Sequence, residues 1–277
     1  MKIAYFGCDL FIGCLDVFRA HNHDIVAIFV AGNKQENKNI CEYAAAEKIQ
    51  CVTDKPTEQH IKMLEDMGVE CFFSIEYEYL IPLPSAQVMT LNMHPTLLPE
   101  GRGATPLNYL ILQYPQHAGI TFHKLASHFD EGDIVYQSPV QLDDNEGLES
   151  LVVKLSYKIP KLLNDVLDNL SELYQNAKPQ SGGSYWPKIT DQQRLLNWQD
   201  DINSINLMVR TFGRFGVIAC IEQEIWLVNH VEIYKTVHSI PSGTQVAHDI
   251  KICVVAVSEG LVVIYKDSIV ERRDLNK

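Results

Sequence analysis

The sequence predicts an α/β protein, in which a mostly parallel sheet with helices on both faces is followed by a smaller β-rich domain. Two features of the 277-residue chain predict this fold class. In residues 1–140, short apolar runs alternate with segments whose apolar side chains repeat at helical spacing, and such alternation is typical of a parallel sheet. After a polar segment at residues 176–184, short strand-like runs follow one another, as in a small barrel or sandwich.

The first half of the chain alternates strands and helices in a Rossmann-like order. Short segments rich in β-branched or aromatic residues are expected to be buried strands: Lys2–Phe6, Asp24–Val30, Glu70–Ile75 and Val88–Asn92. Segments with an apolar period of about 3.6 residues are expected to be the helices between them: Phe11–His21, Asn39–Glu47 and Thr57–Met67. Thr57 stands where a helix cap is expected.

Two further strands and a long helix complete the first domain, which we expect to span residues 1–183. The strands are Gly119–Leu125 and Asp133–Leu142, and the helix is Leu148–Leu173, whose leucine-rich stripe indicates core packing. Residues 184–277 are expected to form the C-terminal domain. Its elements are a helix at Ile202–Phe212 and strands at Gly216–Ile221, Glu224–Val228, Val231–Tyr234, Lys251–Val257 and Leu261–Tyr265.

The composition indicates a globular protein that does not bind nucleic acid. The formal net charge is −12, whereas nucleic-acid binding draws most of its affinity from Lys and Arg on phosphates. No apolar run approaches the roughly 18 residues of a membrane helix, so we expect no membrane association, and the first residues lack a signal peptide's apolar core. The seven cysteines are scattered without a Cys-x-x-Cys pair, which favours a cytoplasmic location and argues against a zinc site.

The segment Leu91–Pro106 concentrates polar residues, prolines and glycines directly after an apolar strand. Ligands of open α/β sheets bind at the carboxyl ends of the strands, and in an extended segment Asn92 and His94 project to the same side. Asn92 offers an amide donor for an oxyanion, and His94 can exchange a proton near neutral pH. The pair could serve acyl transfer to an amine. The alternative is that both residues only cap the strand and anchor the loop.

Two motifs carry a resemblance to a known family. NMHPTLLPEGRGATP at residues 92–106 resembles the signature of the folate-dependent formyltransferases, and GITFHKLASHFDEGDIVYQ at residues 119–137 is similar to a second segment of that family. The family includes methionyl-tRNA formyltransferase, glycinamide ribonucleotide formyltransferase and the sugar N-formyltransferases. Because YWPKITDQQRLLNW at residues 185–198 looks like the start of the C-terminal domain of the tRNA-type members, the resemblance covers most of the chain. It implies the formyltransferase fold with an OB-like C-terminal domain.

The resemblance implies an enzyme that uses N10-formyltetrahydrofolate as co-substrate, without a metal, and a catalytic set of Asn92, His94 and Asp130. Asn92 would donate to the oxyanion, and His94 would take the proton of the attacking amine. Asp130 would orient His94 and raise its basicity, or hold a water that relays a proton. Asp133 is a rival for this role in the same loop.

Residues of two loops and of the wall between them are expected to contact the folate, by the same resemblance. They are Glu76, Tyr77, Glu78, Leu97, Leu98, Pro99, Ala126 and Asp133. Gly7 ends the first strand before a helix, whose N-terminus would suit an anion. Gly7 and Arg102 are therefore the candidates for binding a phosphate of the substrate.

The acceptor that the sequence favours is a nucleotide-linked amino sugar. The tRNA-type members carry a long basic loop after the second strand, but residues 31–50 here are short and nearly charge-balanced. GRGATPLNY and GITFHKL look closest to enzymes that formylate dTDP- or UDP-linked 4-amino or 3-amino sugars, with the dTDP-4-amino-4,6-dideoxyglucose type favoured, and this implies a role in surface polysaccharide (O-antigen) synthesis. The β-rich C-terminal region is a possible homodimer surface. The alternatives are methionyl-tRNA formyl transfer and a non-catalytic module that binds nucleotide sugar or folate. A nicotinamide-dependent dehydrogenase would need a GxGxxG motif, which is missing.

Overall fold

The computed structural model describes residues 1–33 and 35–274, and this part of the chain separates into two compact units. The first unit contains Met1–Pro106, Gln116–Gln141 and Val153–Pro187; the second contains Leu107–Pro115, Leu142–Val152 and Lys188–Lys277. Residues 275–277 of the predicted C-terminal domain lie outside the described residues. The single domain boundary at residues 183 and 184 stays a prediction.

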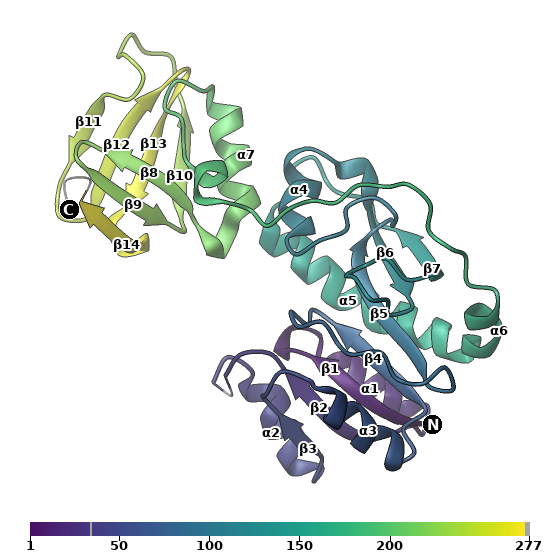
Figure 1. The fold of residues 1–277 in the computed structure, drawn as a ribbon. Helices are drawn as coiled ribbons and strands as arrows, with labels where there is room; N and C mark the ends of the chain where they lie inside the picture. Colours follow the sequence, from purple (N-terminus) through teal and green to yellow (C-terminus); the bar gives the residue numbers. More distant parts are fainter. Residues whose placement is uncertain (34, 275–277) are drawn as a thin grey trace. The chain divides into compact units, whose positions relative to one another are not determined.

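The first unit is built on a seven-stranded sheet with the order β3-β2-β1-β4-β5-β6-β7 (Figure 1). The strands are β1 (Lys2–Gly7), β2 (Asp24–Val30), β3 (Gln50–Val52), β4 (Cys71–Ile75), β5 (Met89–Thr96), β6 (Ala118–His123) and β7 (Ile134–Pro139). β3, β2, β1, β4 and β5 pair in parallel. β6 pairs antiparallel with β5, and β7 pairs antiparallel with β6, so β6 alone runs against the other strands of this sheet. This confirms the predicted mostly parallel α/β sheet.

Alternating side chains of β1 and β4 pack against helices on the two faces of the sheet. On one face, Phe6 and Phe72 share a core cluster with Leu64 of α3 (Glu58–Asp66). On the other face, Phe73 packs edge-on against Phe18 of α1 (Gly13–Ala20), with ring centroids 5.0 Å apart. The predicted helices on both faces are therefore present, and α2 (Lys38–Ala46) contacts β3 at the sheet edge.

The structure corrects one predicted helix and adds elements that no pattern predicted. The helix expected over Leu148–Leu173 is two helices, α5 (Leu148–Asp168) and α6 (Leu170–Gln175). They separate at Asn169, whose side chain donates to the carbonyl oxygen of Asp165, because Asn competes with the helix backbone for hydrogen bonds. The additional elements are β3, α4 (Pro106–Leu112), β11 (Gln245–His248) and β14 (Ile269–Asp274).

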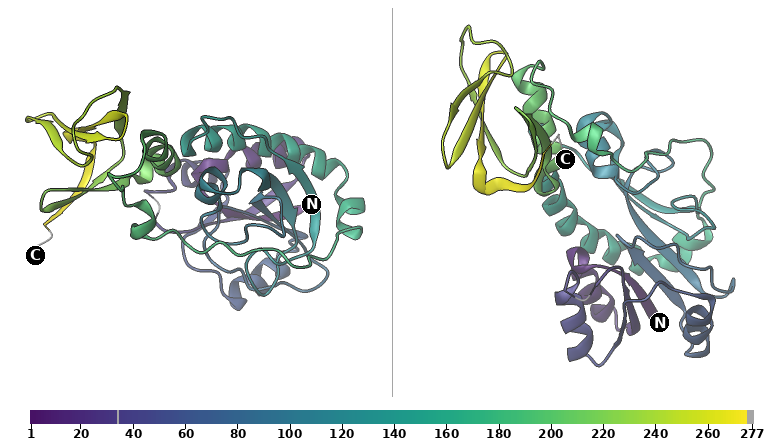
Figure 2. Two further views of the ribbon diagram at one scale, coloured as in Figure 1. Left: turned by 90° about the horizontal axis from the view of Figure 1, so that it is seen from above. Right: turned by 60° about the vertical axis from the view of Figure 1, so that its left-hand side comes forward.

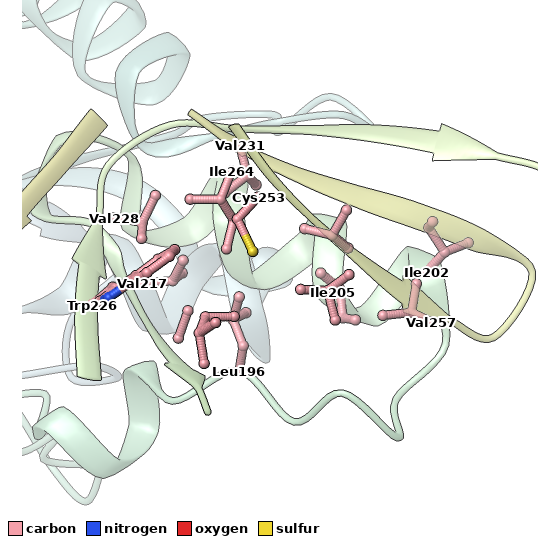
Figure 3. Packing of buried hydrophobic residues seen from close by; sticks show 14 of the residues in the cluster. Leu196, Ile202, Ile205, Val217, Trp226, Val228, Val231, Cys253, Val257 and Ile264 are labelled. Atoms are coloured by element: carbon pink, nitrogen blue, oxygen red, sulfur yellow. The ribbon is translucent and has the colours of Figure 1, made fainter. Parts of the chain in front are cut away.

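The second unit confirms the β-rich C-terminal region. Its remaining strands are β8 (Val217–Ile221), β9 (Glu224–Val228), β10 (Val231–Lys235), β12 (Ile252–Val257) and β13 (Gly260–Tyr265), and its helix α7 is Ile202–Phe212, as predicted (Figure 2). They form antiparallel sheets of four strands (β10-β13-β12-β11) and three strands (β14-β9-β8). Ile205 of α7, Trp226 of β9 and Val257 of β12 lie in one buried cluster (Figure 3), so the helix and both sheets share a core.

In the part of the chain that the structure covers, no helix combines the length and the apolar character needed to cross a membrane.

Candidate functional site

A cavity of about 260 Å³ lies in the first unit, at the carboxyl ends of β4 and β5. The strand order reverses between β1 and β4, and open α/β sheets bind ligands at such a point. The parallel pairing sets Ser74 of β4 beside Asn92 of β5. Asn92, His94 and Asp130 all line the cavity. The structure therefore brings together the three residues that the sequence singled out.

β5 extends further than predicted, because it continues through His94 and Pro95 to Thr96. The pairing of β5 with β6 shifts between His94 and Thr96. Pro95, which has no N–H to give to a ladder, occupies this irregularity, as expected for a proline within a sheet. The shift leaves Asn92 and His94 on the cavity side of the strand.

His123 orients the amide of Asn92. Nδ1 of His123 lies 2.8 Å from the carbonyl oxygen of Lys124, which can only accept, so this nitrogen carries the proton. Nε2 of His123 then accepts a hydrogen bond from Nδ2 of Asn92 at 2.9 Å. Asn92 is half-buried, and its second amide hydrogen remains for an oxygen atom in the cavity.

His94 and Asp130 form a buried pair in which no proton lies between the two side chains. Nε2 of His94 donates to the carbonyl oxygen of Gly101 at 2.8 Å, so in the neutral ring Nδ1 is unprotonated. This Nδ1 lies 3.3 Å from Oδ1 of Asp130. Oδ2 of Asp130 accepts the backbone N–H of Gly103 at 2.9 Å. A proton delivered to Nδ1 would therefore lie between the two side chains, and the carboxylate would balance its charge.

The surroundings of the pair set both protonation states. Burial lowers the pKa of His94, and the raising effect of the Asp130 charge does not overcome it. Burial alone would raise the pKa of Asp130, but His94, His123 and the Gly103 N–H together bring it down to about 2. At neutral pH the histidine is therefore neutral and the carboxylate is ionised, which is the combination that accepts a proton.

Gln180, in the polar segment predicted at residues 176–184, holds the two loops of the site in place. Nε2 of Gln180 donates to the carbonyl oxygens of Asp130 and Gly132, at 2.8 and 2.7 Å. Oε1 of Gln180 accepts from Nε and a terminal nitrogen of Arg102, at 3.1 and 2.8 Å. Asp130 has a left-handed backbone with φ of 60°, a conformation that costs about 1–3 kcal/mol unless its surroundings enforce it. The hydrogen bond from Gln180 to the carbonyl oxygen of Asp130 helps to hold this backbone conformation.

The predicted folate residues divide into two groups. Glu76, Tyr77, Glu78 and Ala126 line the cavity. The others have contacts elsewhere. The side chain of Leu97 packs against Gly119 and fills the space that a Cβ there would take. The backbone of Leu98 is hydrogen-bonded to Thr121 of β6 and to Gln137 of β7. Pro99 lies against Gly183, and Asp133 pairs with Lys124 at 3.3 Å. As folate contacts, these four remain predictions.

The two predicted phosphate contacts, Gly7 and Arg102, do not line the cavity. A Cβ on Gly7 would lie 2.6 Å from the Tyr5 ring, so packing explains this glycine. The acidic Asp9 stands at the start of the following helical turn, where it opposes an anion, and its carboxylate caps α2 at Ile40. Arg102 uses its guanidinium on Gln180 and Gly182. Their binding of phosphate stays a prediction.

Three residues of the site were not singled out from the sequence. His123 stands within the second family-like motif, whose pattern could have identified it. Gln180 lies in a polar segment that carries no local signal. Tyr185, 63% exposed, lines the cavity next to the same segment. Within residues 1–33 and 35–274, no group of three or more His, Cys, Asp and Glu side chains is arranged to hold a metal ion.

Comparison with known proteins places these motifs in a family. The chain is 28% identical over 259 residues to the methionyl-tRNA formyltransferase of Coprothermobacter proteolyticus, which covers 89% of this chain and 85% of the relative. The fold is similar to that of HypX from Aquifex aeolicus (TM-score 0.73, 16% identity), with 95% of this chain matching 45% of HypX, so the chain spans less than half of that protein. It is also similar to the N-formyltransferase of Helicobacter canadensis in complex with folinic acid and dTDP-3-aminofucose (TM-score 0.64, 16% identity, 96% of this chain and 98% of the other).

The model of the formyl transferase family matches residues 1–167, which contain every residue that lines the cavity except Tyr185. The matched region is more than half of the chain and includes Asn92, His94 and Asp130. The chain therefore belongs to the formyl transferase family.

Proposed function

We propose that the enzyme transfers a formyl group from N10-formyltetrahydrofolate to the amine of a nucleotide-linked amino sugar. The observation that supports this chemistry is the buried pair of His94 Nδ1 and Asp130 Oδ1. The two atoms lie 3.3 Å apart, with the histidine neutral and the carboxylate ionised. Asn92, held by His123, supplies the donor beside it. A base and an oxyanion donor in one cavity are what acyl transfer to an amine requires.

The reaction moves one proton from the attacking nitrogen to N10 of the folate. The amine nitrogen attacks the formyl carbon, and the carbonyl oxygen becomes an oxyanion that the free N–H of Asn92 stabilises, a contribution of about 10²–10³ in rate. His94 takes the proton from the attacking nitrogen at Nδ1, and Asp130 balances the imidazolium charge. The C–N10 bond then breaks as N10 regains that proton, which leaves the formamide and tetrahydrofolate.

The cavity wall combines apolar side chains, which suit a flat heterocycle, with polar side chains suited to the reaction. Tyr77, Tyr79, Leu80, Ile81 and Leu125 form an apolar portion, and Asn92, His94 and Asp130 form the polar portion. Ligand sites commonly combine such walls with a few convergent polar groups. We place the pterin of the folate against the apolar portion, next to Tyr77, Glu78 and Ala126, with Glu76 at the start of the same loop.

Two findings favour a nucleotide-linked amino sugar as acceptor. Within this class we propose dTDP-4-amino-4,6-dideoxyglucose made for surface polysaccharide, on the resemblance of the sequence motifs alone. The chain has a net charge of −12, which opposes binding to tRNA. Structural similarity extends over nearly the whole length of an enzyme that was solved with a dTDP-linked amino sugar. The second candidate is methionyl-tRNA, because two methionyl-tRNA formyltransferases are similar in sequence to 89% and 96% of this chain.

A direct assay separates the two acceptors. The purified chain would be incubated with N10-formyltetrahydrofolate and either dTDP-amino sugars or methionyl-tRNA, and the products would be analysed by mass spectrometry. We expect a mass gain of one carbonyl group on a 4-amino sugar and none on methionyl-tRNA. Formylation of methionyl-tRNA alone would replace the proposed acceptor, and no transfer to any amine would overturn the proposal.

A further inference from the structure

The described wall of the cavity carries carboxylates without an opposing Lys or Arg, and its other titratable side chains include His94, His123 and His128. Three carboxylates line it, Glu76, Glu78 and Asp130, and none of the described lining residues is Lys or Arg. Such a wall attracts a cation and repels a phosphate. The part of the acceptor that enters the cavity should therefore be the amine with its sugar, whereas the phosphates should stay outside.

Glu76 lines the same cavity as Asn92, His94 and Asp130. It directly follows β4, with a left-handed backbone at φ of 48°, a conformation that costs about 1–3 kcal/mol at a residue other than glycine and is common at functional sites. The residue is also exposed to solvent. Glu76 therefore touches both the reaction space and water.

Two titratable groups from other loops interact electrostatically with Glu76. Desolvation by the surrounding cavity wall raises the pKa of Glu76, and the charge of Asp130 raises it further. Cys8 follows β1, and its thiol has a pKa raised to about 11 by burial and then by the charge of Glu76, so this neighbour stays neutral. A carboxylate with these surroundings binds a proton more readily than an ordinary glutamate.

The proposed reaction removes two protons from the acceptor nitrogen, whereas the His94–Asp130 pair can accept only one. A primary aliphatic amine such as that of Lys has a pKa near 10.4, so an amine acceptor enters largely as the ammonium ion. An ammonium nitrogen has no free electron pair, and it must lose a proton before it attacks. A second proton leaves the same nitrogen after attack and goes to N10. His94 can carry only one of them at Nδ1, because Nε2 is bonded to Gly101.

We propose that Glu76 binds the acceptor in its ammonium form and takes the first proton from it. The N–H bond of the ammonium breaks and an O–H bond forms on the Glu76 carboxylate, which leaves a neutral amine and a neutral acid. The acid then returns the proton to water through the open side of the cavity. This inference rests on the proposed formyl transfer to an amine.

The variant Glu76→Gln tests the step because it keeps the size of the side chain and removes the charge. We expect kcat/KM for the amine to fall about 10–100-fold at neutral pH, the loss typical of a hydrogen bond to a charged group. The deficit should shrink as the pH rises, because more of the acceptor is then already the free amine. A role in folding alone would give a loss that does not depend on pH. Equal activity of variant and wild type at every pH would overturn the proposal.

The variant Glu131→Gln is the matched control. Glu131 is in the loop next to Asp130, is 49% exposed beside His128, and does not line the cavity. This variant removes the same charge from the same side of the molecule. We expect it to behave as the wild type, so a similar loss in both variants would assign the effect of Glu76 to net charge.

Binding measurements keep this inference separate from the proposed function. Calorimetry would compare dTDP-4-amino-4,6-dideoxyglucose with the sugar nucleotide that carries a hydroxyl at the same carbon. The wild type should bind the amine at least about tenfold more tightly, and Glu76→Gln should lose the preference. An equal preference in both proteins would overturn the role of Glu76. A preference in the wild type without any formyl transfer would instead overturn the proposed function and leave the ammonium site standing.

Discussion

Gln180 donates a hydrogen bond from its amide nitrogen to the carbonyl oxygen of Asp130, 2.8 Å away. A second bond from the same nitrogen reaches Gly132, and the amide oxygen accepts from Arg102. The side chain therefore joins the loop of the proposed acid–base residue to the loop of the family-like LLPEGRG motif. Residues that lock the geometry of a site in this way affect turnover more than substrate affinity.

The first prediction concerns this bridge. Gln180→Ala should lower kcat about tenfold and leave the KM for either substrate nearly unchanged, because the Asp130 loop loses its support. Gln180→Glu should be as damaging, since a carboxylate still accepts from Arg102 but cannot donate to the two carbonyl oxygens. Steady-state kinetics on both variants would check this. Gln175→Ala, an exposed position on α6, is the control, and a fully active Gln180→Glu would contradict the bridging role.

The second prediction concerns the two polar residues of β5. Asn92→Ala and His94→Ala should each reduce kcat at least about 10²-fold, because one removes the oxyanion donor and the other the proton carrier. Circular dichroism and thermal unfolding would show whether each variant remains folded. Full activity in a folded variant would remove that residue from the chemistry.

The third prediction concerns pH. His94 accepts a proton only while it is neutral, and burial lowers its pKa below the ordinary value of about 6.5. The acid limb of kcat should therefore lie below about pH 6.5. In Asp130→Asn, a charge that raises the pKa of His94 is gone, so the limb of the residual activity should move to still lower pH. A limb above the ordinary histidine value, or one that stays in place in Asp130→Asn, would argue against His94 as the base.

The sequence was sufficient for every strand of the seven-stranded sheet except the three-residue β3, because each longer buried strand and amphipathic helix is a local pattern. The same holds for Asn92 and His94, because side chains two positions apart in one extended strand project to the same side. The break of the long helix at Asn169 was missed, because the leucine stripe continues across it. Here hydrophobic periodicity outweighed the weaker signal of a single Asn.

The rest of the site depends on contacts between distant residues. Arg102 looks like a phosphate ligand in the sequence, but its guanidinium binds Gln180, 78 residues further along the chain. Glu76 is expected from the sequence as a folate contact, and only the strand order sets it in a cavity with Asp130. No local pattern encodes either pairing, because the first joins the loop after β5 to the segment after α6, and the second joins the loops after β4 and β6.

The last prediction concerns Gly132, at which a Cβ would lie 1.8 Å from the carbonyl oxygen of Lys124. That same oxygen accepts the Nδ1 proton of His123, and His123 in turn orients Asn92. Gly132→Ala must push this carbonyl aside, so it should destabilise the fold by about 1–3 kcal/mol and lower kcat about tenfold or more. Thermal unfolding and steady-state kinetics would measure both effects.

Gly13→Ala is the matched control for this substitution, because its added Cβ would meet Pro160 at an ordinary 3.6 Å and its place in α1 favours alanine over glycine by up to about 1 kcal/mol. We expect the control to unfold at the same or a higher temperature with unchanged kcat. If Gly132→Ala matched it in both measurements, the Lys124 carbonyl would have room to move without disturbing His123. The chain of contacts from Gly132 to Asn92 would then not be what holds the oxyanion donor in place.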